Sequence, residues 1–129
     1  MSQENVEVTR RIMEATARRA YQAVLPDLDP DLKIDDMDIP EGTATDSFLQ
    51  WLARWDAAWE AWRIEDLVVR AADNERVVAL FKMVVKGKSS GVELSRLDAV
   101  VMSFRAGKVI ETGYYNDQAQ ALKAVGLEE

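Results

Sequence analysis

The sequence predicts an α+β fold in which helices pack against one face of a curved, largely antiparallel sheet. Two observations favour it: helical spacing of apolar residues in the first half of the chain, and four strand-like segments joined by short turns in the second half. The order helix, short strand, helix and four strands is typical of this class. With 129 residues and no linker-like tract, the chain is expected to form one domain over residues 1–129.

Two long helices are predicted from apolar spacing and capping residues. The first covers residues 4–25, where Pro26 ends the helical pattern. The second begins after Asp46 or Ser47, either of which can cap it. Its four tryptophans recur at helical spacing and form one stripe that needs a large apolar partner, most simply the sheet. The stripe consists of Trp51, Trp55, Trp59 and Trp62.

The strands follow from a change to alternating periodicity. Residues 32–38 alternate weakly and predict a short strand, with a loop over 40–45. From residue 64 onward the chain is rich in Val, Ile, Leu, Phe and Tyr, and the short connections between segments are typical of hairpins. Asp117 can cap a closing helix over 118–125. The four later strands are expected at 64–72, 76–86, 92–104 and 109–116.

Composition excludes several kinds of chemistry. The chain has no Cys and no His, which excludes disulfides, thiol nucleophiles and Ser-His-Asp catalysis. Acid–base work is left to Asp, Glu, Lys and Tyr, and we expect neither a metal nor a cofactor. The formal charge of −7 and the scattered basic residues argue against a nucleic-acid partner, because phosphate binding needs clustered Lys and Arg.

The negative charge is concentrated in one segment. Residues 27–41 hold seven Asp and Glu against Lys33 and so contribute −6 of the −7. Residues 27–38 imitate the acidic spacing of a calcium loop, but Leu32 stands where the sharp turn of that loop needs Gly. A helix–strand junction therefore explains the pattern better than a metal site.

Nothing in the sequence indicates a membrane protein. No apolar run approaches the ~20 residues that a membrane-spanning helix needs. The N-terminal Met-Ser-Gln-Glu-Asn lacks the basic and apolar regions of a signal peptide. We expect a cytoplasmic protein that makes no membrane contact.

Besides the Trp-rich helix, four short motifs stand out along the chain: Ser2-Gln-Glu-Asn-Val-Glu-Val, Leu28-Asp-Pro-Asp-Leu, Phe104-Arg-Ala-Gly-Lys-Val and Tyr115-Asn-Asp-Gln-Ala-Gln-Ala-Leu. Together they resemble the SnoaL-like proteins of the nuclear transport factor 2-like superfamily, over nearly the whole chain and in the same order. The resemblance implies a cone-shaped fold, with a curved antiparallel sheet wrapped around helices and an internal pocket open at one end. The same fold serves cyclases, isomerases, dehydratases and non-catalytic modules.

Comparison with ketosteroid isomerase, a member of this superfamily, matches one of its catalytic residues in this chain and shows that two others are replaced. Asp36 matches the carboxylate that shuttles the proton there. Ile12 or Met13 replaces the oxyanion-hole tyrosine, and Val100 replaces the second, acidic donor. Isomerisation of that type is not expected, because both groups that would stabilise an enolate are absent.

Asp98 is the leading catalytic candidate and Asp36 the second. Strand alternation places Asp98 on the face of Val100 and Met102, which by the resemblance lines the cone. An inward carboxylate among apolar residues suits proton transfer. The alternative is a structural ion pair with Lys82 or Arg96, since buried charges are normally paired. For Asp36 the alternative is a solvated strand end.

The resemblance also predicts an apolar ligand pocket and a homodimer. The outward face of 92–104 is small and apolar, so we expect a second copy to cover the sheet. The function predicted is acid–base catalysis without a cofactor on a hydrophobic carbonyl compound, of cyclase, isomerase or dehydratase type. The alternative is a non-catalytic dimeric ligand-binding or interaction module with a closed core. Residues expected to contact the ligand are Met13, Trp55, Val78, Lys82, Val100, Met102, Thr112 and Tyr114.

Overall fold

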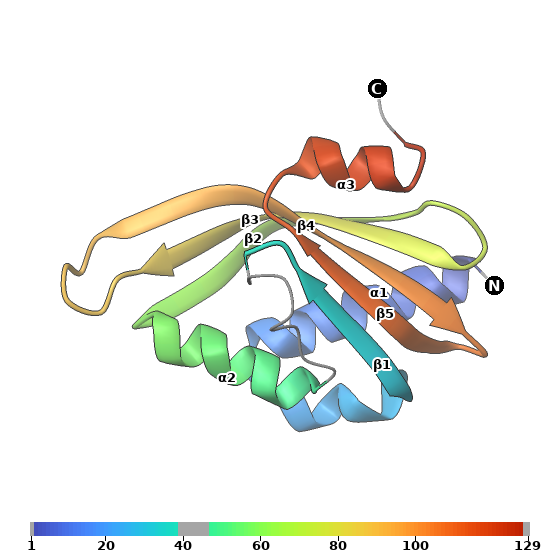
Figure 1. The fold of residues 1–129 in the computed structure, drawn as a ribbon, viewed down its shortest axis with the longest axis horizontal. Coiled ribbons are helices and arrows are strands. Elements are labelled where there is room, and N and C mark those ends of the chain that lie inside the picture. Colours follow the sequence, from blue (N-terminus) through green and yellow to red (C-terminus); the bar gives the residue numbers. More distant parts are fainter. Residues whose placement is uncertain (1, 39–46, 128–129) are drawn as a thin grey trace.

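The computed structural model describes residues 2–38 and 47–127 and confirms the α+β class. Five strands form one sheet in the order β1-β5-β4-β3-β2, with helices on both of its faces (Figure 1). The expected loop over 40–45 and the alternative cap Asp46 lie outside the described residues. In chain order the elements are α1 (Ser2–Ala17), the 3₁₀ turns η1 (Tyr21–Ala23) and η2 (Leu25–Asp27), β1 (Leu28–Asp36), α2 (Phe48–Ala58), β2 (Ala61–Ala71), β3 (Arg76–Lys86), β4 (Glu93–Arg105), β5 (Lys108–Tyr115) and α3 (Gln118–Ala124).

The first helix is shorter than the predicted 4–25. It ends at Ala17, and Arg19 adopts a left-handed φ of 65°. The Arg19 guanidinium lies 3.8 Å from the centre of the Trp62 ring and donates to the Trp62 carbonyl at 2.7 Å. After these contacts with a distant strand the chain turns into η1 and η2. Pro26 lies in η2, nine residues after the end of the helix, and therefore does not end it.

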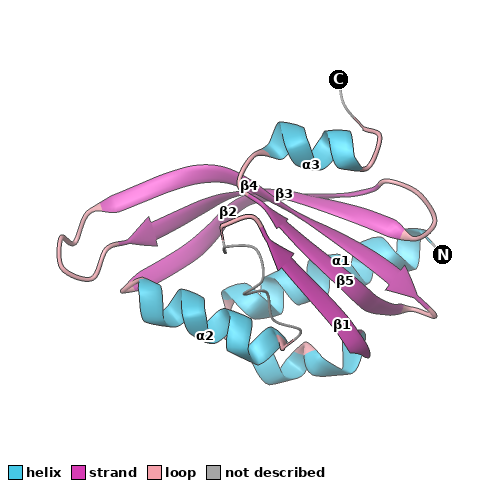
Figure 2. Ribbon diagram, viewed as in Figure 1, coloured by secondary structure: helices cyan, strands magenta, loops and turns pink. Residues whose placement is uncertain are grey.

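The second helix is capped as predicted but ends early. The Ser47 hydroxyl accepts from the Gln50 amide at 3.2 Å, which satisfies one of the free amides at the helix start. The helix stops at Ala58, and Trp59 is already extended. Trp62 therefore belongs to β2, and the prediction of one helical stripe of four tryptophans is wrong. Trp62 still meets Trp55, at 6.1 Å between ring centres, because the chain folds back (Figure 2).

The sheet is mixed, because β1 joins an otherwise antiparallel set. Strands β2 to β5 pair antiparallel, within a few residues of their predicted bounds. The turn between β4 and β5 has positive φ at Ala106 and Gly107, the geometry that two-residue hairpin turns favour. Strand β1 instead pairs parallel with β5, with Asp36 opposite Tyr114. This pairing brings the acidic end of β1 beside the end of β5.

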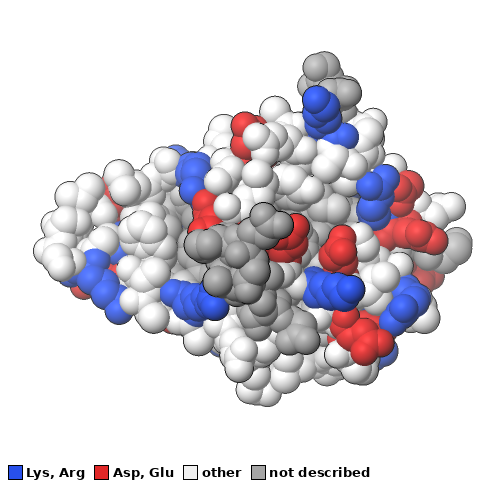
Figure 3. Space-filling model, viewed as in Figure 1, with Lys and Arg blue, Asp and Glu red and all other residues white. Residues whose placement is uncertain are grey.

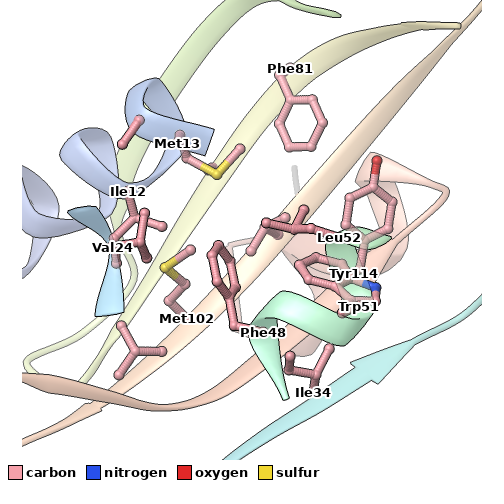
Figure 4. Packing of buried hydrophobic residues seen from close by; sticks show 14 of the residues in the cluster. Ile12, Met13, Val24, Ile34, Phe48, Trp51, Leu52, Phe81, Met102 and Tyr114 are labelled. Atoms are coloured by element: carbon pink, nitrogen blue, oxygen red, sulfur yellow. The ribbon is translucent and has the colours of Figure 1, made fainter. Parts of the chain in front are cut away.

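The sheet separates two apolar cores. On the inner face, side chains from α1, α2 and the strands fill the space between helices and sheet (Figure 4). On the outer face, α3 packs on a smaller cluster (Figure 1). The expectation that helices cover only the inner face is wrong, since α3 of the same chain covers part of the face assigned to a second copy. The outer cluster consists of Val78, Ala99, Val101, Ala121 and Val125.

Two wider features bear on the earlier exclusions. None of the helices in the described ranges is long and apolar enough to cross a membrane. On the face drawn in Figure 3, Lys and Arg side chains are dispersed among Asp and Glu and form no continuous basic patch.

Candidate functional site

A pocket of about 520 Å³ lies between α2, the end of β1 and the paired strands β3 and β4. Its volume is in the range of small-molecule sites, and its walls are mainly apolar with a few polar groups. The apolar part of the wall consists of Trp51, Trp55, Ala58, Trp59, Met83, Val85 and Leu94. The polar part consists of Asp36, Asp38, Arg54, Ser95 and Arg96.

Asp36 is a buried carboxylate in the wall of this pocket. It shares the inner face of β1 with Leu32 and Ile34, as predicted, and only 5% of it is exposed. Its Oδ2 accepts from the Trp51 indole Nε1 at 2.8 Å, and its Oδ1 accepts from the Asp38 amide at 2.8 Å. Burial raises the pKa of Asp36 above its usual value, although the Trp51 hydrogen bond opposes the rise. Asp36 is therefore a desolvated acid and not a solvated strand end.

Asp98 is fully buried, and the described hydrogen bonds to its carboxylate all come from other side chains. Arg96 holds it with Nε at 2.5 Å from Oδ1 and Nη2 at 3.1 Å from Oδ2. The Tyr114 hydroxyl donates to Oδ2 at 2.5 Å. Burial, and then the charge of Asp98, raise the pKa of Tyr114, so this phenol stays protonated as a donor. Asp98 lines neither this pocket nor the inner cavity described below.

Lys82 is not the partner of Asp98. In the register of β3 and β4, Phe81 stands opposite Asp98, so Lys82 points to the other face of the sheet. There its ammonium lies 3.8 Å from Glu65. Of the two partners considered for a structural ion pair, the structure shows Arg96.

Arg96 connects the buried Asp98 to the pocket. Its side chain is 45% exposed, and its Nη2 also lies 2.7 Å from Asp38 Oδ2. Asn116 donates to the other oxygen of Asp38 at 3.0 Å. Hydrogen bonds to both carboxylates raise the pKa of Arg96, with Asp98 the larger cause. A continuous chain of polar contacts thus joins β5, β4 and the end of β1.

A second cavity lies deeper under the helices and holds only about 40 Å³. The interior that the resemblance predicted to be a pocket is therefore mostly filled by core side chains, and the pocket of about 520 Å³ lies beside it, next to α2 and the end of β1. Val78 and Lys82 are on the outer face, so their assignment to the pocket wall is wrong. The residues expected to contact the ligand that do line the inner cavity are Met13, Trp55, Val100, Met102, Thr112 and Tyr114.

The acidic segment at the start of the chain's first strand offers no calcium loop. Residues 28–36 are extended as β1 and do not fold around an ion. Within the described ranges, no group of three or more carboxylates converges so as to hold a metal.

Sequence reasoning did not place Asp38, Asn116 or Trp51 at the site. Each reaches it through a long-range contact: Asp38 meets Arg96 from 58 positions away, and Asn116 meets Asp38 from 78. The one available signal was local. Arg96 and Asp98 are two positions apart in a strand and so share a face.

No protein-family model matches the sequence, and no curated protein matches it. Solved structures do match it over nearly its whole length. A candidate polyketide cyclase from Xanthomonas campestris pv. campestris has 20% identity and a TM-score of 0.78, over 96% of this chain and 98% of its own. An NTF2-like protein from Burkholderia pseudomallei has 19% identity and a TM-score of 0.71, over 95% and 97%.

A third structure, TerC crystallised with polyporic acid, has 16% identity and a TM-score of 0.70, over 95% of this chain and 98% of its own. Identities this low establish a shared fold. The matched structures cover the five-stranded sheet and its helices together, so the shared fold extends over nearly the whole chain. The chain has the NTF2-like fold, which it shares with these solved structures.

Proposed function

We propose that the protein is an acid–base enzyme of cyclase, isomerase or dehydratase type that needs no cofactor and acts on a hydrophobic, carbonyl-bearing small molecule. The observation that carries this proposal is Asp36, a buried carboxylate with a raised pKa in the wall of an apolar pocket. Perturbed acids in pockets of this size are typical of catalytic sites. Two structural neighbours, a candidate polyketide cyclase and TerC with polyporic acid, support a small-molecule ligand.

The proposed step is reversible proton transfer next to a carbonyl group. Asp36 takes a proton from the carbon beside the carbonyl, the C–H electron pair forms the enolate C=C bond, and negative charge moves to the carbonyl oxygen. The same carboxyl then returns the proton to carbon. A raised pKa suits this cycle, because the group must both accept and release a proton near the working pH.

Arg96 is the group proposed to stabilise the enolate oxygen. Ile12 and Met13 are buried apolar residues, and Val100 lines the inner cavity, so the usual oxyanion donors are missing. Arg96 lies in the pocket wall with a fixed positive charge, which favours developing negative charge. The longest of its described contacts is that of Nη1, 3.5 Å to Asp38, so the N–H groups of Nη1 are the donors proposed to reach a ligand.

Asp98 is proposed as a positioning residue for Arg96. It does not reach the pocket wall, so it has no direct access to a ligand there. Its two hydrogen bonds fix the guanidinium plane, and the Tyr114 hydroxyl fixes Asp98 in turn. This chain of contacts is the arrangement that pre-organises a charged donor.

A non-catalytic ligand-binding or interaction module remains the second candidate, because the inner cavity is nearly filled by core side chains. A homodimer through the sheet stays part of the proposal. Leu97 and Val68, on the outer face beyond α3, are 60% and 50% exposed, and they offer apolar surface for a second copy to cover. A cytoplasmic location and the absence of a nucleic-acid partner stay predictions from composition.

Deuterium incorporation beside the carbonyl of 1-tetralone tests the proposal. Proton NMR in D₂O follows exchange with wild-type protein, Asp36→Asn and the control Asp35→Asn, whose side chain is exposed on the same strand. We expect the wild type to accelerate exchange, Asp36→Asn to lose at least ~100-fold, the lower range for removing an acid–base group, and Asp35→Asn to retain the rate. Binding of 1-tetralone without any acceleration by the wild type would instead support the non-catalytic module.

A further inference from the structure

Thr16 on α1 carries a buried hydroxyl with no described partner. Only 8% of the residue is exposed, and within the described residues its Oγ1 makes no hydrogen bond. Buried hydroxyls in proteins are nearly always paired. Thr9 on the same helix shows the usual solution, since its Oγ1 donates to the Asn5 carbonyl at 2.9 Å. Thr16 is the exception, since it is buried on the same helix but its hydroxyl has no such bond.

The unpaired hydroxyl lies at the inner cavity. Thr16 belongs to its wall, together with apolar side chains, Thr112 and Tyr114. The Tyr114 hydroxyl is committed to Asp98, so it does not serve Thr16. A space of about 40 Å³ is too small for a ring but admits one oxygen-bearing substituent.

The inner cavity and the larger pocket share part of their walls. Trp51, Trp55 and Met83 line both spaces. Met83 is an unbranched thioether that adapts easily to a neighbouring group. A ring system seated in the larger pocket can therefore direct one substituent past these side chains toward Thr16.

We propose that Thr16 is a specificity residue for ligands that carry a second oxygen, a hydroxyl or carbonyl, at the end remote from the reacting carbonyl. The reacting carbonyl lies at Asp36 and Arg96, and the second oxygen hydrogen-bonds to Thr16 Oγ1 in the inner cavity. The inference rests on the proposed function and narrows its substrate class to apolar ring systems with oxygens at both ends.

Matched ligands and matched variants test this inference. The hydroxyl of 6-hydroxy-1-tetralone lies across the ring pair from its carbonyl, and 1-tetralone lacks that hydroxyl. Calorimetry gives the dissociation constant of each for the wild type, Thr16→Val and Thr16→Ser. Thr9→Val is the control, because Thr9 is a buried threonine of the same helix that lines neither space. Thermal melting confirms that each variant folds.

One net hydrogen bond corresponds to about tenfold in affinity. We expect the wild type, Thr16→Ser and Thr9→Val to bind the hydroxylated ligand about tenfold more tightly. We expect Thr16→Val to bind both ligands alike, with unchanged affinity for 1-tetralone. An unchanged preference in Thr16→Val overturns the inference and shows that Thr16 serves a bound water or packing only.

The inference and the proposed function fail in different ways. If both tetralones bind and Asp36→Asn abolishes exchange, but the preference does not depend on Thr16, only the inference about Thr16 is overturned. If neither tetralone binds the wild type, the apolar ligand site is overturned and the Thr16 inference with it.

Discussion

Removal of the Arg96 guanidinium is expected to lower the free energy of unfolding, because it leaves a buried carboxylate without its cationic partner. Arg96→Ala deletes two hydrogen bonds to Asp98, a carboxylate that is 0% exposed. Hydrogen bonds to charged groups are worth ~1.5–3 kcal/mol each, and loss of one partner of a buried pair costs ~3–5 kcal/mol. Arg96 itself is 45% exposed and the Tyr114 bond remains, so the lower end applies. We expect a loss of about 3 kcal/mol in the free energy of unfolding.

Urea denaturation at pH 7 measures this loss, and a double-mutant cycle assigns it. Asp98→Asn keeps the shape of the side chain and removes its charge, so the double variant avoids a buried unpaired carboxylate. We expect a coupling energy of about 2 kcal/mol between the two sites. Arg63→Ala is the control: Arg63 also contacts two carboxylates, but at the surface, and its loss is expected to leave the unfolding midpoint nearly unchanged. A cost below ~1 kcal/mol for Arg96→Ala would refute the claim that Asp98 depends on Arg96.

Three further predictions follow from single contacts. Because the pKa of Asp36 is higher in the folded state than its usual value of 3.8, ionisation of Asp36 opposes folding above that pH. Asp36→Asn is therefore expected to unfold at a higher urea concentration than the wild type at pH 7. This difference is expected to disappear near pH 3.8, where the wild-type carboxyl is protonated in the folded state. Ser47→Ala removes the acceptor for the Gln50 amide and is expected to cost about 1 kcal/mol in the same assay. Burial and the bond to Asp56 raise the pKa of Tyr21 to about 12, so Asp56→Asn is expected to lower it in an ultraviolet titration.

The strands were predictable because their signals are local. Alternation and turn residues lie within each hairpin, and β3 spans the predicted residues 76–86. The ends of the two long helices were not predictable in this way. Trp59 and Trp62 continue the helical spacing, and no local residue shows that the chain becomes extended after Ala58. The first helix ends two residues before Arg19, which packs on Trp62, a residue 43 positions further along the sequence.

The candidate site was predictable only where it depends on a single strand. Asp36 was placed correctly on the inner face, because alternation within β1 decides that face. Lys82 and Val78 were assigned to the wrong face of the sheet. Their face depends on how β3 pairs with β4, and the spacing of residues within β3 does not determine that pairing. The position of α3 on the outer face was not predicted either. A helix of seven residues is too short for its apolar pattern to show which face of the sheet it packs on.

The pH dependence of 1-tetralone exchange tests the central claim, proton transfer by Asp36, most directly. The carboxylate form must accept the proton, so the rate is expected to rise with pH through an inflection above the usual aspartate value of 3.8. Trp51→Phe removes the indole hydrogen bond that lowers the pKa of Asp36 and is expected to move that inflection upward. An inflection at the same pH in the wild type and in Trp51→Phe would contradict the assignment of the reaction to Asp36.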